Sequence, residues 1–305
     1  MKSKTIKAII AKKISEWLGS IDDESARKIA EESTIVTGGC IASMLLGEEV
    51  HDFDLYFRTH DAALRLAEYY VKRFEVKDAR GIPCPIKILD KEGRIKIVIK
   101  SAGIASEDGT LKAYEYFEQP GAREAADYIG DVMDRDEEID EAIQKQEDEK
   151  PRYRPVFMST NAITLANKIQ LILRFYGEPD QLHENYDFAH CTNYWTSWDG
   201  ELVLRPKALE ALLARELVYI GSKYPVCSIF RLRKFIKRGF TINAGQIVKM
   251  CMQISELELS NLDVLEDQLT GVDCAYFIQV LAKLKDKDPE KINATYLVEI
   301  IDRMF

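Results

Sequence analysis

Hydrophobic residues recur at helical spacing near the start of the chain. Over residues 5–32 they lie three or four positions apart, as in a helix that buries one face; they are Ile6, Ile9, Ile10, Ile14, Trp17 and Leu18. Asp22-Asp23 separates this stretch from a second helical stretch that reaches about Ala30. The same spacing over residues 61–73 predicts a third helix. We expect these helices to pack beside a sheet.

Short runs rich in β-branched and aromatic residues predict strands between and after the helices. They lie at residues 34–37, 53–57, 74–77, 86–89 and 95–99, and the turn at residues 90–93 joins the last two into a hairpin. Residues 168–175 fit either a strand or a buried helix. A short helix at 179–185 and a strand at 186–195 follow. The pattern predicts an α+β fold with a mixed sheet flanked by helices.

The second half of the chain divides into an irregular part and a helical part. Residues 101–150 show little regularity and end in an acidic stretch, 131–149, which fits a solvated helix or a mobile insertion. We favour the helix because isoleucine, valine and methionine residues recur through it. Helical periodicity dominates from Pro206 onward. We predict a domain over residues 1–204, with the acidic insertion at about 101–150, and a helical domain over residues 205–305.

Composition limits the classes of protein to which the chain belongs. A length of 305 residues with 46% hydrophobic content suffices for a sizeable core and about two domains. The six cysteines show no Cys-x-x-Cys pairing, so neither a zinc site nor a disulfide framework is indicated. No apolar run approaches the roughly 18 residues of a membrane span, and no signal-type apolar segment follows the first residues. We therefore expect no membrane association and a cytoplasmic location.

Charge alone argues against a general nucleic-acid binder, because the formal net charge is −9. Its distribution changes that picture. Much of the acid lies in the stretch 131–149, whereas basic residues cluster over residues 231–238. A basic surface on the second half of the chain is therefore compatible with the overall negative charge.

The candidate chemistry begins at Gly38-Gly39, which follows the β-branched run Thr34–Thr37. A strand running into paired glycines lets backbone N–H groups approach a phosphate closely. Asp52-Phe53-Asp54 comes shortly afterwards, and on a strand both carboxylates point to one face while Phe53 points to the other. Two adjacent carboxylates repel each other unless a cation lies between them, and Mg²⁺ prefers such oxygen ligands. The bland alternative is an ordinary turn followed by two capping aspartates.

These motifs together resemble the head of the DNA polymerase β-like nucleotidyltransferase superfamily. The spacing from Gly38 to Asp54 is similar to that of enzymes that add or repair the tRNA 3′ CCA end, which carry Gly-Gly-x-x-Arg-Asp-x-Leu-Leu-Gly, four residues and Asp-x-Asp. This chain has Ala42-Ser43 in place of Arg-Asp. The resemblance implies a nucleotidyltransferase sheet, Mg²⁺ as cofactor, a nucleoside triphosphate as substrate, and triphosphate contacts from Gly38, Gly39 and Ser43.

Two-metal phosphoryl transfer usually needs a third carboxylate beside the pair. Asp187 is our first candidate, because it begins a run expected to be a strand and small Ala189 would leave the site open. Glu115 is the second candidate, near the position at which CCA-adding enzymes place theirs. Either acid could instead be an exposed strand residue or a helix cap. We interpret His190 as structural rather than catalytic.

The order of strand 168–175, short helix and Tyr186-Asp187-Phe188 also resembles uncharacterised nucleotidyltransferases of bacteriophages. That resemblance would place the protein in the cytoplasm of a host cell.

Basic residues with helical spacing suggest a second binding element. Arg231, Lys234 and Arg238 fall on one side of a predicted helix, with Ile229, Leu232, Phe235 and Ile236 expected on its apolar face. Such side chains could hold a triphosphate or an RNA backbone. A solvated charged face is the alternative.

The sequence therefore predicts a Mg²⁺-dependent nucleotidyltransferase in which Asp52, Asp54 and Asp187 hold the metal ions and position the reacting groups. An RNA or tRNA 3′ end is the favoured acceptor, while a protein hydroxyl and a small molecule also fit. The rival hypothesis is a catalytically silent relative that binds nucleotide or a partner protein. The oligomeric state stays open.

Overall fold

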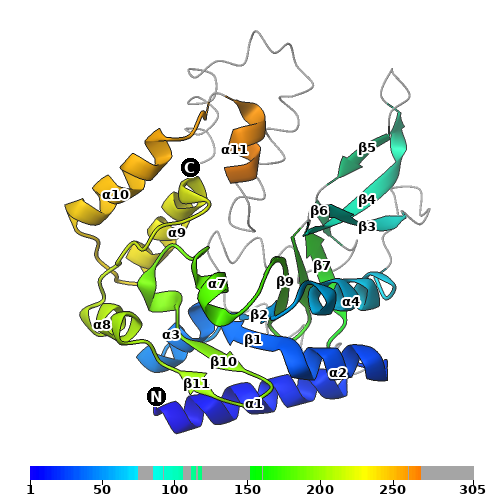
Figure 1. Ribbon diagram of the computed structural model, residues 1–305, viewed down its shortest axis with the longest axis horizontal. Helices are drawn as coiled ribbons and strands as arrows, with labels where there is room; N and C mark the ends of the chain where they lie inside the picture. Colours follow the sequence, from blue (N-terminus) through cyan, green and yellow to red (C-terminus); the bar gives the residue numbers. More distant parts are fainter. Residues whose placement is uncertain are drawn as a thin grey trace, which may run out of the picture. The chain divides into compact units, whose positions relative to one another are not determined.

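The computed structural model describes residues 1–74, 85–91, 93–105, 111–114, 116–118, 152–159, 161–259 and 261–268 (Figure 1). The chain divides into two compact units. The first consists of Met1–His183 and Cys191–Leu209, and the second of Glu184–His190 and Glu210–Phe305. The chain therefore enters the second unit briefly at residue 184, returns at residue 191 and enters it again at residue 210.

A mixed sheet forms the centre of the first unit. Eight strands of the described residues lie in the order β11-β10-β1-β2-β9-β8-β7-β6. The neighbours β2 and β9 run parallel, whereas the other neighbouring strands are antiparallel. The strands are β1 (Thr34–Thr37), β2 (Phe53–Phe57), β6 (Tyr116–Glu118), β7 (Pro155–Ser159), β8 (Ala162–Leu165), β9 (Ile169–Tyr176), β10 (Tyr194–Thr196) and β11 (Leu202–Val203).

A separate antiparallel sheet contains the predicted hairpin. Its strands β3 (Ile86–Lys91), β4 (Arg94–Ala105) and β5 (Leu111–Tyr114) lie in sequence order. The hairpin prediction is confirmed by the pairing of Ile88 with Ile97. At its turn Gly93 has φ of 72°, and the Tyr176 hydroxyl donates a hydrogen bond to its carbonyl at 2.7 Å.

Helices α1 (Ser3–Gly19), α2 (Glu24–Ser33), α3 (Gly39–Leu46) and α4 (His60–Val71) contribute to the core of the first unit (Figure 1). The predicted apolar stripe of α1 is buried at Ile6, Ile10, Ile14 and Trp17. Side-chain caps start the next helices, since Asp23 accepts from the Ala26 amide and Thr59 from the Ala62 amide. Trp17 joins α1 to α4 by donating to the Tyr70 hydroxyl at 2.8 Å.

The described part of the chain after residue 205 is largely helical, as predicted. It contains α8 (Pro206–Ala214), α9 (Pro225–Lys237), α10 (Ala244–Ser255) and α11 (Leu262–Gln268). Along the chain, α7 (Pro179–His183) and a 3₁₀ helix at Ala189–Cys191 lie between β9 and β10. The fold is therefore α+β, with a mixed sheet flanked by helices.

The region 168–195 contains one strand prediction that is confirmed and one that is wrong. Residues 169–176 form β9, so the strand alternative is correct there. The predicted strand 186–195 is wrong, because only Tyr194–Thr196 joins the sheet. The backbone at 187–189 bonds instead to a distant segment: the Ala189 amide donates to Val218, and the Ile220 amide to Asp187. Tertiary partners have replaced the local strand tendency.

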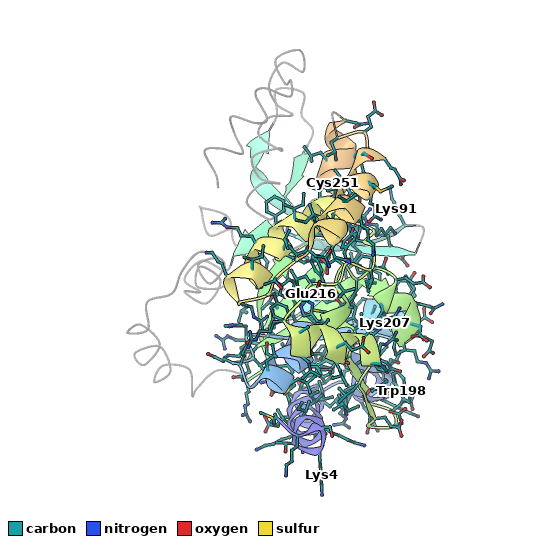
Figure 2. All side chains as sticks on the ribbon, turned by 90° about the vertical axis from the view of Figure 1, so that its left-hand side faces the viewer. Lys4, Lys91, Trp198, Lys207, Glu216 and Cys251 are labelled. Carbon is teal, nitrogen blue, oxygen red and sulfur yellow. The ribbon has the colours of Figure 1, made fainter. Side chains whose placement is uncertain are left out.

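Several predictions concern residues outside the described ranges. They include residues 75–77 of the strand predicted at 74–77, the acidic helix at 131–149 and the helical pattern beyond residue 268. Among the described cysteines, Cys40, Cys191 and Cys227 are buried and Cys251, on α10, is exposed (Figure 2). In the part of the chain that the structure describes, no helix has the length and apolar character needed to span a bilayer.

Candidate active site

The turn between β1 and α3 has a backbone that requires glycine. Gly38 has φ of 94° and ψ of −148°, a conformation that side-chain-bearing residues rarely adopt. Its amide donates to the Cys191 carbonyl at 3.2 Å. Gly39 then begins α3, and the N-cap residue Gly38 has no side chain with which to cap the amides of this first turn.

The space around Gly39 is open. A Cβ atom placed on Gly39 would meet no atom within 4 Å. Helix N-termini carry partial positive charge and present N–H groups, so they favour anions. The turn thus combines a helix start whose N-cap residue has no side chain with open space beside Gly39.

Asp52 and Asp54 lie beside this turn on the second strand. The alternation predicted from the sequence is confirmed: Phe53, Leu55 and Phe57 are buried, while Asp52 and Asp54 are half-buried on the other side. Strand β2 itself begins at Phe53, so Asp52 immediately precedes it. Asp54 pairs in register with Thr37 of β1, the residue before Gly38.

The charges of the two carboxylates reach the first turn of α3. Burial, together with the charges of Asp54 and Asp52, raises the pKa of the Cys40 thiol well above its usual range. Cys40 follows the glycine pair directly, and its thiol lies 3.8 Å from the Thr37 carbonyl oxygen. The glycine turn and the aspartate pair therefore lie close together at the end of β1.

The donor set of this site fits Mg²⁺ in part. Two hard carboxylate oxygens on one face of a strand are suitable ligands, and Mg²⁺ commonly completes its shell with water and substrate phosphates. Within the described ranges, no three His, Cys, Asp or Glu side chains gather in a cluster that could hold a metal ion. Glu115, the second candidate for a third carboxylate, lies outside those ranges.

Asp187, the first candidate, belongs to the second unit. Its side chain is buried, and both carboxylate oxygens have protein partners. Arg231 donates to Oδ2 at 2.9 Å, and the Phe188 amide donates to Oδ1 at 3.0 Å. Asp187 is therefore part of an internal ion pair in this structure.

The predicted phosphate contacts fall into two groups. Ser43 is buried on α3, one helical turn after Gly39. Arg231, Lys234 and Arg238 belong to the second unit, where Lys234 is exposed and Arg231 pairs with Asp187. The Arg238 carbonyl accepts a hydrogen bond from Arg215 at 2.9 Å.

The expected apolar face of α9 needs a correction. Ile229 and Ile236 are each 48% exposed, whereas Cys227, Ser228 and Phe235 are buried. Arg231 lies three residues after Ser228 and four before Phe235, so it shares their side of the helix. The inward face is set by the buried partner Asp187 as well as by apolar residues.

Sequence reasoning missed the residues that contact Thr37, which immediately precedes the glycine turn. The Thr37 hydroxyl lies 2.9 Å from Nε2 of His183 and 2.8 Å from the Asn193 carbonyl oxygen. Thr37 and His183 are 146 positions apart, so no local pattern could connect them. The position of Thr37 immediately before Gly38 was the one available signal.

Comparisons with known proteins identify relatives of the chain. Residues 8–215 match the model of the Gabija anti-defense 2 family. The protein called Gabija anti-defense 2 of Bacillus phage SPbetaL7 is 20% identical over 123 residues, which are 40% of this chain and 31% of that protein. The chain thus covers less than a third of that relative.

Solved structures of CCA-adding enzymes also resemble the chain. The Thermotoga maritima enzyme complexed with tRNA is 14% identical, with a TM-score of 0.38, over 90% of this chain and 51% of the enzyme. The Bacillus stearothermophilus enzyme in complex with CTP is 14% identical, with a TM-score of 0.36, over 93% and 53%. This chain spans about half the length of each enzyme. Since the family match itself covers more than half of the chain, the chain belongs to the Gabija anti-defense 2 family.

Proposed function

We propose that the chain is a Mg²⁺-dependent nucleotidyltransferase that moves a nucleoside monophosphate from a nucleoside triphosphate to an acceptor hydroxyl. The observation that carries this proposal is the meeting of two motifs at the end of β1. The backbone of Gly38 and Gly39 starts a helix whose N-cap residue has no side chain, and the carboxylates of Asp52 and Asp54 lie close enough to raise the pKa of Cys40 in its first turn.

Each part of the site has a role in this reaction. The amides of the glycine turn bind triphosphate oxygens, and Ser43 is a further candidate contact on the same helix. Asp52 and Asp54 would hold Mg²⁺, which would supply positive charge against the phosphate oxygens. The acceptor hydroxyl oxygen forms a bond to the α-phosphorus and its proton passes to solvent, while the bond from that phosphorus to the bridging oxygen breaks and pyrophosphate leaves.

The third carboxylate is proposed as Asp187, with Glu115 as the alternative. Asp187 would have to exchange its contact with Arg231 for a metal ion. The two possibilities differ in which substitution abolishes transfer. Asp187→Asn does so if Asp187 is the third carboxylate, and Glu115→Gln does so if Glu115 is.

The favoured acceptor is an RNA 3′ end, such as that of tRNA. The spacing from Gly38 to Asp54 supports this choice, as do the basic side chains Arg231, Lys234 and Arg238 of the second unit. A protein hydroxyl or a small molecule would use the same chemistry. The family name indicates action against a bacterial defence, and we propose that nucleotidyl transfer in the host cytoplasm is the means.

A catalytically silent, nucleotide-binding or partner-binding protein is the second candidate function. Two observations favour it. Ala42-Ser43 replaces the Arg-Asp of CCA-adding enzymes, and both carboxylate oxygens of Asp187 are bonded within the protein.

The test is transfer of α-labelled nucleotides into total tRNA and, separately, into total protein of a bacterial host. We expect label in one pool with Mg²⁺, loss of labelling after chelation, and recovery when Mg²⁺ is restored. Absence of label from both pools, with nucleotide binding retained, would contradict the transferase proposal and favour the catalytically silent binding protein.

A further inference from the structure

The hydroxyl of Thr37 is the centre of a buried network beneath the glycine turn. Thr37 is fully buried at the end of β1. Its Oγ1 atom lies 2.9 Å from His183 Nε2, 2.8 Å from the Asn193 carbonyl oxygen and 3.4 Å from the Cys191 carbonyl oxygen. The Cys191 carbonyl also accepts the Gly38 amide at 3.2 Å. One carbonyl is therefore shared by the turn and by the residue that precedes it.

The geometry assigns the protons of this network. A hydroxyl has one proton, and a 2.8 Å approach to the Asn193 carbonyl oxygen is favourable only if that proton lies between the two oxygens. His183 must then donate from Nε2 to Oγ1. Burial and the nearby Arg205 lower the pKa of His183 to about 4, so at neutral pH the ring is neutral and its one proton lies on Nε2.

The same network is the place where the chain crosses between the two units. His183 is the last residue before the excursion Glu184–His190 into the second unit, and Cys191 is the first residue after it. The second unit holds this excursion through the Asp187–Arg231 ion pair and backbone bonds to Val218 and Ile220. Thr37 therefore contacts both ends of the excursion.

We propose that Thr37 and His183 are positioning residues for the glycine turn. The Thr37 hydroxyl joins His183 and Asn193, which flank the excursion in the chain, to the end of β1, and the neighbouring Cys191 carbonyl fixes the direction of the Gly38 amide. A turn held in this way is ordered before its ligand arrives, which lowers the cost of binding. The identification of the ligand as a triphosphate rests on the proposed function. The ordering of the turn by Thr37 and His183 is independent of it.

Hydrogen exchange of the peptide that contains Gly38 and Gly39 tests the proposal without any ligand. Thr37→Val keeps the side-chain shape but removes the donor and acceptor, so exchange at the turn should accelerate about tenfold. Thr37→Ser should keep the wild-type rate because it retains the hydroxyl.

Thr34→Val is the matched control. Thr34 lies on the same strand, is equally buried, and donates its hydroxyl to the Ala30 carbonyl at 2.6 Å. Its loss should lower stability without changing exchange at Gly38. Equal exchange at the turn in Thr37→Val and Thr34→Val would overturn the proposal.

His183 provides an independent route if Thr37→Val does not fold. His183→Leu should accelerate exchange at the turn, and His183→Gln, which places an amide donor near the Nε2 position, should restore much of the protection. Equal rates in these two variants would contradict the role of His183.

Nucleotide binding separates this proposal from the proposed function. The dissociation constant of Mg·ATP should rise about tenfold in Thr37→Val and stay unchanged in Thr34→Val. If wild-type protein binds no nucleotide, the proposed function fails, while the exchange contrast still decides whether Thr37 orders the turn.

Discussion

At the residue scale, the second unit contains a buried ion pair whose partners differ in exposure. The side chain of Asp187 is 6% exposed and that of Arg231 is 33% exposed. An isolated buried carboxylate is strongly disfavoured, whereas a partly exposed guanidinium keeps contact with water. The two partners should therefore respond differently to loss of the other.

We predict that Arg231→Met destabilises the protein by roughly 3 kcal/mol, and Asp187→Asn by clearly less. Arg231→Met leaves a charged, buried Asp187, while Asn can still accept from the Phe188 amide. The measurement is urea unfolding monitored by far-ultraviolet circular dichroism. Tryptophan fluorescence would report on the first unit, because all three tryptophans lie there. The reverse order of the two losses would contradict this account of the pair.

His190 is a second buried residue with an unusual environment. It is 1% exposed, lies among Phe188, Phe235 and Phe240, and neither ring nitrogen has a hydrogen-bond partner within the described part of the chain. Burial lowers the pKa of His190 from 6.5 to about 4. The ring is thus neutral in the folded protein, in agreement with a structural role.

This pKa predicts an acid-dependent loss of stability. Between 6.5 and about 4 the unfolded chain binds a proton that the folded chain does not, so stability falls as the pH falls through this window. The loss from His190 is roughly 2 kcal/mol at about pH 5. We expect His190→Phe to unfold at higher urea concentration than wild type, with a difference that grows from about pH 7 to about pH 5. His183 is present in both proteins, so its own titration does not contribute to the difference between them. A difference in unfolding midpoint that does not change with pH would contradict the role of the His190 pKa.

At the element scale, α3 is limited by two glycines with different backbones. Gly38 precedes it, and Gly47 ends it with φ of 74°. A Cβ on Gly47 would meet no atom within 4 Å, so the cost of a side chain there comes from the backbone alone.

We predict that Gly47→Ala lowers stability by about 1 kcal/mol. Gly19, the last residue of α1, also has open space around a Cβ but no positive φ. Gly19→Ala should therefore be neutral or stabilising by up to about 1 kcal/mol. Thermal unfolding of both variants gives the comparison, and changes of the same size and sign would show that backbone conformation is not the cause.

The elements that the sequence predicts well are those whose partners are implied by local periodicity. The apolar stripe of α1, the alternation of β2 and the hairpin of β3 and β4 belong to this class. Residues 187–190 do not, because their backbone bonds to Val218 and Ile220 and their aromatic side chains contact Phe235 and Phe240. Local β propensity does not predict contacts with residues that lie later in the chain.

At the scale of the whole molecule, the chain interleaves its two units by sending Glu184–His190 into the second. The residues of the candidate site likewise differ in how far apart they lie in the sequence. Its glycine turn and aspartates were predictable because twenty consecutive residues contain them. Thr37 and His183 were not, since their contact joins segments 146 positions apart. The ion pair of Asp187 with Arg231 was hard to predict for a similar reason, because Arg231 belongs to a later helix.

The most direct test of the central claim is nucleotidyl transfer by matched carboxylate variants. Asp54 lies in the candidate site, whereas Asp61 is exposed at the start of α4. Wild type, Asp54→Asn and Asp61→Asn are incubated with α-labelled nucleotides, Mg²⁺ and total tRNA or total protein, and nucleotide binding is measured in the same preparations. We predict that wild type and Asp61→Asn transfer label with release of pyrophosphate, and that Asp54→Asn loses at least about a hundredfold in rate while remaining folded. Undiminished transfer by Asp54→Asn, or binding without transfer by wild type, would contradict the account.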